Sequence, residues 1–205
     1  LATYKLAVLY EAYRQRELGL LDFTRTVPVA EVYVQEDLGT LASVPRQPNG
    51  ELRVADAVRA MITLSDNTSA TILLDLLDHC NIDATLAALG LRATSVNTRD
   101  LPTTAMDMAR LMAAIVGGEG LSAASAQEMV TLLLAQQTRL GIPRGVPADV
   151  PVGNKTGSWD GALHDVAVVY APGGPFVIAV LTDGSRGWEV IGRVAAAVYW
   201  YLAVV

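Results

Sequence analysis

Residues 61–68 read Met61-Ile62-Thr63-Leu64-Ser65-Asp66-Asn67-Thr68. The apolar residues that lead into this stretch recur at helical spacing and predict a helix over 54–64, and a second helix is expected over 68–78. Asp66 and Asn67 are residue types that cap helix N-termini. The stretch therefore predicts a short polar loop between two helices.

The pattern outward from this loop changes from helices to strands along the chain. Helices are expected over 4–18, 54–64, 68–78, 83–89, 104–116, 122–136 and 188–202, and Val-rich strands over 150–157, 165–171 and 176–183. The Gly/Pro-rich stretch 140–149 is the best boundary between them. We therefore predict an α+β fold in which a mostly helical subdomain, residues 1–145, packs on an antiparallel sheet with a closing helix, residues 146–205.

Composition excludes several classes of protein. Half of the residues are hydrophobic (52%) and 18% are charged, which is typical of a globular chain. The net charge is −6 and no Lys/Arg cluster is visible, so nucleic-acid binding is not expected. The longest apolar run, Val194–Val205, is shorter than the roughly 20 residues that span a bilayer. We expect it to be the buried end of a helix.

The single cysteine, Cys80, permits no disulfide within the chain. It lies in Asp78-His79-Cys80, which raises the hypothesis of a thiol nucleophile. A lone cysteine is more often a small buried apolar residue, and that is the interpretation we favour.

Three short motifs carry the chemistry, and their order matters more than any one of them. They are Ala2-Thr3-Tyr4-Lys5 at the start of a helix, Ser65-Asp66-Asn67 between two helices, and Lys155-Thr156-Gly157 at the end of a strand. Except for Ala2, they match the Ser-x-x-Lys, Ser-Asp-Asn and Lys-Thr-Gly signature of class A β-lactamases and penicillin-binding proteins. The segments 61–68, 152–157 and 164–169 are also similar to that family. The chain thus resembles the penicillin-recognising serine hydrolases, whose N-terminal strands would precede Leu1.

The resemblance implies a role in acyl transfer for residues in all three motifs. Ala2 stands at the nucleophile position, with Lys5 one helical turn later as general base. Ser65 and Lys155 would relay a proton to the leaving group. The backbone N–H groups of Ala2 and Ser158 would form an oxyanion hole.

Substrate recognition is implied for a second set of residues. Asn67 would donate its amide to a substrate carbonyl, and Lys155 and Thr156 would bind the substrate carboxylate. Gly157 would let the strand edge approach the substrate. His164 falls near the place where many family members have a carboxylate-binding Arg, and it reads equally well as a strand-end histidine bonded to a loop carbonyl.

Two departures from the family limit what the chain can do. Ala2 has a methyl group where the nucleophilic hydroxyl belongs, and Thr3 is turned by roughly 100° around the helix, so acylation is not expected. Ala2 is either an engineered replacement, which the remaining motif residues favour, or a natural loss. The second departure is the stretch 91–102, which is short and has no Glu for deacylation, with only Asn97 and Asp100 to approximate the missing pair.

We therefore expect an extracytoplasmic serine hydrolase that acts on β-lactams or peptidoglycan stem peptides and is disabled by Ala2. The short loop favours a DD-peptidase over an efficient β-lactamase. No metal, cofactor or membrane span is expected, and the chain should be a monomer. The alternative is a non-catalytic module that binds β-lactams or peptidoglycan.

Overall fold

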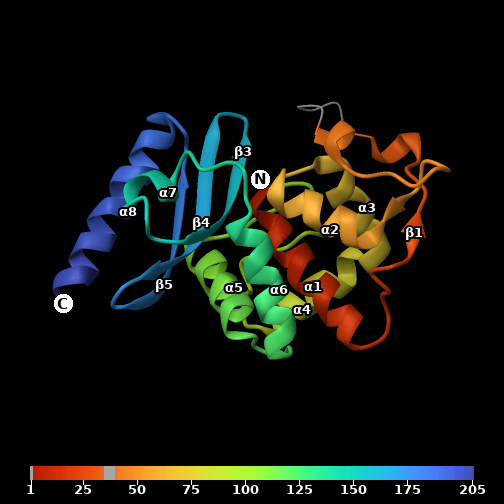
Figure 1. Ribbon diagram of the computed structural model, residues 1–205, viewed down its shortest axis with the longest axis horizontal. Helices are drawn as coiled ribbons and strands as arrows, with labels where there is room; N and C mark the ends of the chain where they lie inside the picture. Colours follow the sequence, from red (N-terminus) through yellow and green to blue (C-terminus); the bar gives the residue numbers. More distant parts are fainter. Residues whose placement is uncertain (1, 35–39) are drawn as a thin grey trace.

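The computed structural model describes residues 2–34 and 40–205 and confirms the α+β fold (Figure 1). Its helices are α1 (Lys5–Glu17), α2 (Val54–Thr63), α3 (Asn67–Leu77), α4 (His79–Ala88), α5 (Ala105–Gly117), α6 (Ala123–Leu134), α7 (Ile142–Gly145) and α8 (Gly187–Val204). Its strands are β1 (Thr26–Val27), β2 (Leu52–Arg53), β3 (Val152–Trp159), β4 (Ala162–Ala171) and β5 (Gly174–Thr182), and its 3-10 turns are η1 (Ala2–Tyr4), η2 (Glu31–Tyr33) and η3 (Thr40–Ser43).

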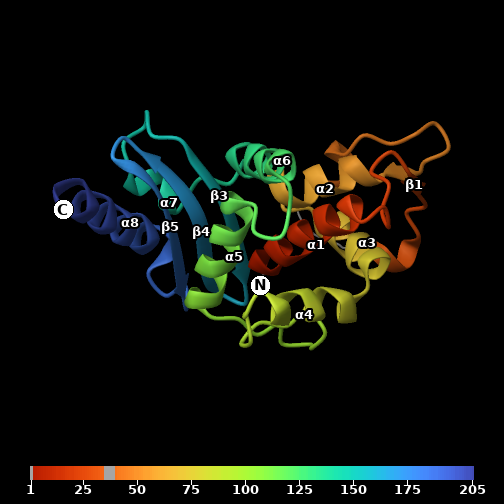
Figure 2. The same cartoon turned by 90° about the horizontal axis from the view of Figure 1, so that it is seen from below.

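Helix α1 is the central helix of the helical part. Every residue from Lys5 to Tyr13 is buried, so the helix has no exposed face over these residues. Figure 2 shows α1 between α6 and α4, both of which it contacts. The first turn of this helix, η1, contacts β3 and β4. The start of α1 is therefore fixed at the junction of the helices with the sheet.

The main sheet has the order β3-β4-β5, and all of its neighbours are antiparallel. Helices α5 and α6 cover one face, and α7 and α8 cover the other (Figure 2). Strand β4 is accordingly buried on both faces: Val166 and Val168 join the core shared with the helical part, whereas Ala167 and Val169 join the core under α8. Side chains that pair with Val166 therefore face the helical part.

The structure corrects some expectations about the elements. Helix α4 begins at His79 rather than at residue 83, because the Asp78 carboxylate accepts a hydrogen bond from the Cys80 N–H at 2.7 Å and caps the helix. Cys80 is exposed, so its interpretation as a buried apolar residue was wrong. Stretch 140–149, expected as a plain connection, contains α7.

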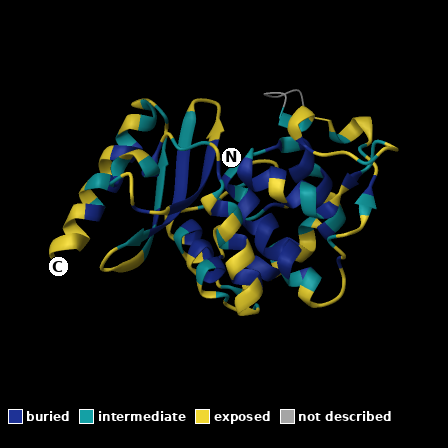
Figure 3. Ribbon diagram, in the orientation of Figure 1, coloured by how far each residue is buried: buried dark blue, intermediate teal, exposed yellow. Residues whose placement is uncertain are grey.

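The end of α8 is also different from what the apolar pattern indicated. Trp200, Tyr201 and Val204 are 59%, 65% and 81% exposed, so the prediction of a buried helix end was wrong (Figure 3). No helix among residues 2–34 and 40–205 has the length and apolar character needed to cross a bilayer. The subdomain boundary near residue 145 stays a prediction.

Candidate active site

The loop between α2 and α3 has Ser65 in the left-handed region, with φ of 58°. Asp66, fully buried, holds this loop: its Oδ2 accepts from the Ser69 N–H at 2.7 Å, and its Oδ1 accepts from the Thr40 hydroxyl at 2.6 Å. The predicted cap at Asp66 is therefore present. The cap fixes the backbone on both sides of Asp66 and so directs Ser65 and Asn67.

Lys5 extends from the first turn of α1 to this loop. Its Nζ donates to the Ser65 carbonyl oxygen at 2.7 Å, the Ser65 Oγ at 3.1 Å and the Asn67 Oδ1 at 2.6 Å. The side chain is fully buried. Because Asn67 uses its Oδ1 for Lys5, its Nδ2 is the amide group available to a ligand.

Lys155 reaches the same hydroxyl from the sheet. It pairs with Val166 across the strands and so faces the helical part. Its Nζ donates to the Ser65 Oγ at 2.9 Å and to the Thr156 carbonyl oxygen at 2.7 Å. Burial lowers the pKa of the Lys155 ammonium well below its usual value, the nearby Lys5 ammonium lowers it further, and Asp165 acts in the opposite direction. A lysine of this kind can accept as well as donate a proton.

Gly157 lies against the first turn of the chain. A Cβ added there would lie 3.2 Å from the backbone nitrogens of Ala2 and Thr3 and 3.1 Å from the Thr3 Cγ2. Glycine thus permits close contact between strand β3 and η1. The Thr3 side chain is 1% exposed and its hydroxyl has no hydrogen-bond partner, so it does not replace a hydroxyl at residue 2.

The hairpin that follows orients the backbone of Ser158. Asp160 and Gly161 have φ of 50° and 82°, as a two-residue type I′ turn requires, and Trp159 pairs with Ala162 beside them. The pair that flanks such a turn is hydrogen-bonded, so the N–H of Ser158 in the next pair points away from β4. Since β3 is at the edge of the described sheet, that N–H is directed outward.

These elements meet at a cavity of about 400 Å³. Its lining residues come from η1, α3, the loop before α5 and the end of β3, namely Ala2, Tyr4, Asn67, Thr71, Leu101, Ser158 and Trp159. Hollows of similar volume beside Tyr199 and beside Trp188 contain none of the motif residues, so volume alone does not identify the site. Residues of the first two motifs, Ala2, Tyr4 and Asn67, thus line the cavity, whereas strand β3 contributes Ser158 and Trp159, which follow the Lys155-Thr156-Gly157 motif directly.

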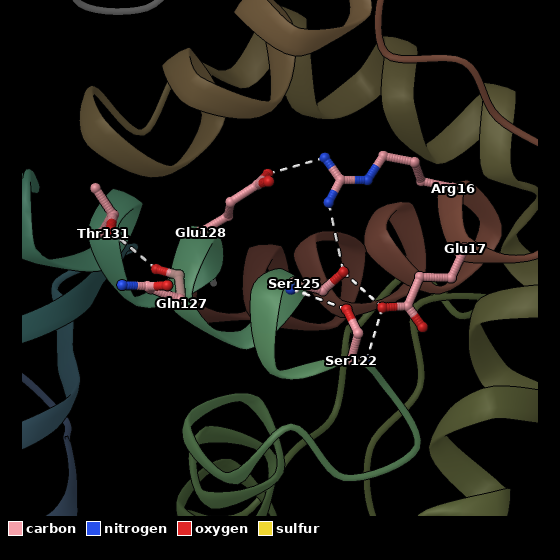
Figure 4. A network of polar contacts seen from close by, with 7 residues as sticks. All are labelled: Arg16, Glu17, Ser122, Ser125, Gln127, Glu128 and Thr131. Carbon is pink, nitrogen blue, oxygen red and sulfur yellow. Dashed lines mark hydrogen bonds and ion pairs between the residues drawn. The ribbon is translucent and has the colours of Figure 1, made fainter.

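A polar network at the far end of α1 holds the helix in place (Figure 4). The Glu17 Oε1 accepts from the Ser122 N–H at 2.7 Å and the Ser125 hydroxyl at 2.6 Å, and these hydrogen bonds lower the pKa of Glu17. Arg16 forms an ion pair with Glu128 at 2.8 Å. These contacts join the end of α1 to the start of α6, while its other end carries Lys5.

Some predicted residues do not line the cavity. The His164 Nδ1 lies 2.8 Å from the Leu163 carbonyl oxygen and 3.1 Å from the Thr182 N–H, so its carbonyl neighbour belongs to strand β4 rather than to a loop, and burial lowers the pKa of this ring. Thr156 is buried and is not part of the lining. Their role in binding a carboxylate stays a prediction.

The loop that was expected to approximate the deacylation pair contributes a different residue. Asn97 donates to the Cys80 Sγ at 3.5 Å, and neither it nor Asp100 lines the cavity. Leu101, with φ of 45°, does. Sequence reasoning missed Leu101 because an apolar loop residue gives no signal of this kind.

Asp165 is a second residue that the sequence did not identify. It is fully buried and accepts from the Asn154 Nδ2 at 3.0 Å and from the Ile142 N–H at 2.8 Å. Burial raises its pKa from 3.8 to about 6, against the effect of its hydrogen bonds and of Lys155. Asp165 thereby joins the start of α7 to the strand that carries Lys155.

Comparison with known proteins agrees with this geometry. The model of the β-lactamase enzyme family matches residues 2–202. The chain belongs to this β-lactamase family. Beta-lactamase L2 of Stenotrophomonas maltophilia is 33% identical to this chain, and the match covers 96% of the chain and 70% of the relative. Beta-lactamase AST-1 of Nocardia asteroides is 38% identical over 66% of the chain. The chain spans about half (49%) of the length of AST-1 over this match.

Solved structures show the same fold as this β-lactamase-family chain. An ancestral class A β-lactamase of Gram-negative bacteria matches 98% of the chain and 84% of its own, with 27% identity and a TM-score of 0.88. The structure of PBP-A covers the whole chain with a TM-score of 0.90 at 24% identity, which shows likeness of fold.

Proposed function

We propose that this chain binds β-lactams, or amides that resemble the D-Ala-D-Ala end of a peptidoglycan stem peptide, in the cleft around Ala2. The arrangement of its side chains is that of a serine acyl-transfer hydrolase, but the chain does not form an acyl-enzyme because Ala2 has no hydroxyl. The observation that carries the proposal is the meeting of Lys5 and Lys155 at the Ser65 hydroxyl, at 3.1 and 2.9 Å, beside a cavity that Ala2 lines.

A serine in place of Ala2 would complete a recognisable set of groups. Lys5 would take the proton of the attacking hydroxyl. Ser65 and Lys155 would pass a proton to the leaving nitrogen, which a lysine of lowered pKa can do. The N–H of Ser158, directed outward from β3, would stabilise the developing oxyanion with the N–H of residue 2.

Penicillins are a reasonable ligand class for this site. One similar solved structure is an acyl-enzyme complex of a PBP-A mutant with penicillin-G. The cleft volume is also in the range of about 300–1,000 Å³ that small-molecule sites have. Among the residues that the structure describes, the cavity lining includes no Asp or Glu that could activate water for deacylation. A penicilloyl group on a serine at position 2 would therefore be released slowly.

The test is acylation of the Ala2→Ser variant by a fluorescent penicillin, followed by gel fluorescence and intact mass. We expect one stable adduct on Ala2→Ser and none on the unchanged chain. Ser65→Ala in the Ala2→Ser background is the matched control and should acylate much more slowly. Absence of any adduct after prolonged exposure would contradict the catalytic part of the proposal.

The alternative function is a binding module without catalysis, which Ala2 itself favours. It predicts that the unchanged chain binds penicillin reversibly and saturably, and that the Ala2→Ser variant also binds it reversibly, without forming a covalent adduct. For either function we propose an extracytoplasmic location, where peptidoglycan is found, and a monomeric state.

A further inference from the structure

The polar groups at the cleft around Ala2 are mainly hydrogen-bond donors. Of the described residues that line it, none is acidic, and Tyr4 and Ser158 bring hydroxyl groups, whereas the Thr71 hydroxyl already donates to the Asn67 carbonyl oxygen at 2.9 Å. The N–H of Ser158 points outward from the sheet, because Ser158 is next to the hydrogen-bonded pair that flanks the turn. The N–H of Ala2 belongs to the first turn of a helix, where backbone donors have no partner within the helix. A site of this composition suits an anion.

Two buried lysine side chains strengthen this preference. Lys5 and Lys155 both donate to one hydroxyl, that of Ser65, so their Nζ atoms lie close together. Asp165, the carboxyl group that acts on Lys155, is itself bonded to Asn154 and Ile142. A ligand carboxylate in the adjacent cavity would stabilise the protonated form of Lys155, which burial and the nearby Lys5 disfavour.

The missing hydroxyl at residue 2 decides which carboxylate fits. In a serine hydrolase the acyl carbon is bonded to the serine oxygen, and hydrolysis replaces that oxygen by one from water. Afterwards the serine oxygen and the new carboxylate oxygen are not bonded and need at least about 2.5 Å between them. The product is thereby displaced from the oxyanion hole. Alanine has no such oxygen, so a carboxylate can stay in place.

We propose that the cleft, as it stands, is a receptor for the carboxylic acid that hydrolysis releases, a ring-opened β-lactam or an N-acyl amino acid, in preference to the intact amide. One carboxylate oxygen accepts from the N–H groups of Ala2 and Ser158. The other takes the space that a serine hydroxyl would fill. This inference rests on the proposed function, because it places the ligand in the same cleft.

Calorimetric titration of the full chain with benzylpenicillin and with its ring-opened penicilloate tests the proposal. We expect penicilloate to bind at least tenfold more tightly than benzylpenicillin. The Ala2→Ser variant should lose at least tenfold of its penicilloate affinity, whereas Ala2→Gly, which also lacks the hydroxyl, should keep the preference. Succinate, a simple dicarboxylate, should bind weakly if the preference depends on more than charge.

Each outcome has a separate meaning. Equal or tighter binding of intact benzylpenicillin would overturn the carboxylate preference and leave the proposed function standing. Failure of both ligands to bind a folded chain would overturn the proposed function and this inference with it. Tight binding of succinate, or a penicilloate affinity unchanged in Ala2→Ser, would show that general charge attraction rather than the missing hydroxyl sets the preference.

Discussion

Asp66 holds the loop that carries Ser65 and Asn67, so its replacement by alanine should cost both stability and ligand affinity. The lost helix cap accounts for about 1 kcal/mol. The Thr40 hydroxyl loses a charged acceptor in a part-buried position, which accounts for about 2 kcal/mol. We expect the free energy of unfolding at pH 7 to fall by about 3 kcal/mol, or the melting temperature by about 6–12 °C for a chain of this size.

The assay for this prediction is urea unfolding followed by circular dichroism. Asp66→Asn keeps the size and one acceptor oxygen, so it should lose less stability than Asp66→Ala. A double-mutant cycle with Thr40→Val should give a coupling energy between about 0.5 and 3 kcal/mol. A loss below about 0.5 kcal/mol for Asp66→Ala, the scale of an ordinary surface substitution, would refute the reasoning.

Three other perturbations test the surroundings of the cleft. Gly184→Ala should lower the free energy of unfolding by about 2–4 kcal/mol, because the new Cβ would lie 1.5 Å from the backbone oxygen of Gly161 in the β3–β4 turn. Thermal unfolding measures this loss. The control is Gly173→Ala, whose new Cβ would have no atom within 4 Å. Asp165 should titrate near pH 6 when its carboxyl group is followed by NMR. Because its pKa in the folded chain is raised from 3.8, the free energy of unfolding should fall as pH rises from about 4 to 6, by about 3 kcal/mol at most. A measured pKa near 4 would contradict this prediction. Leu101→Glu in the Ala2→Ser background should release a penicilloyl adduct at least tenfold faster than Ala2→Ser alone, since the new carboxylate can activate water. Mass spectrometry follows the release, and an unchanged rate would contradict the placement of Leu101 in the cavity lining.

The elements with strong periodicity could be predicted from the sequence, and those set by tertiary contacts could not. Helix α2 and the Val-rich strands have clear patterns, and their predicted positions agree with the structure to within a few residues. Helix α7 was missed because Gly141, Pro143 and Gly145 read as a loop. The helix is held there by the Asp165 carboxylate on the Ile142 N–H, a contact that no local pattern indicates.

The candidate site, too, has parts that the sequence predicted and parts that depend on tertiary contacts. Motif order predicted that Lys5, Ser65 and Lys155 would converge, and the structure places both ammonium groups on the Ser65 hydroxyl. The outward N–H of Ser158 depends on the register of a two-residue turn, and the place of Leu101 depends on a loop with no regular pattern. The resemblance to the family gave the expectation for Ser158, but the direction of its N–H could not be derived before strand pairing was known, and no local pattern indicates the place of Leu101.

We infer that residue 2, Lys5 and Lys155 act on a single bound ligand. Peptide mass mapping of the Ala2→Ser variant after reaction with benzylpenicillin tests this most directly, with Lys5→Met in the same background as control. We expect one penicilloyl group, located on the peptide that contains residue 2 and absent from the Lys5→Met variant. A label on another peptide, or equal labelling of the Lys5→Met variant, would contradict this inference.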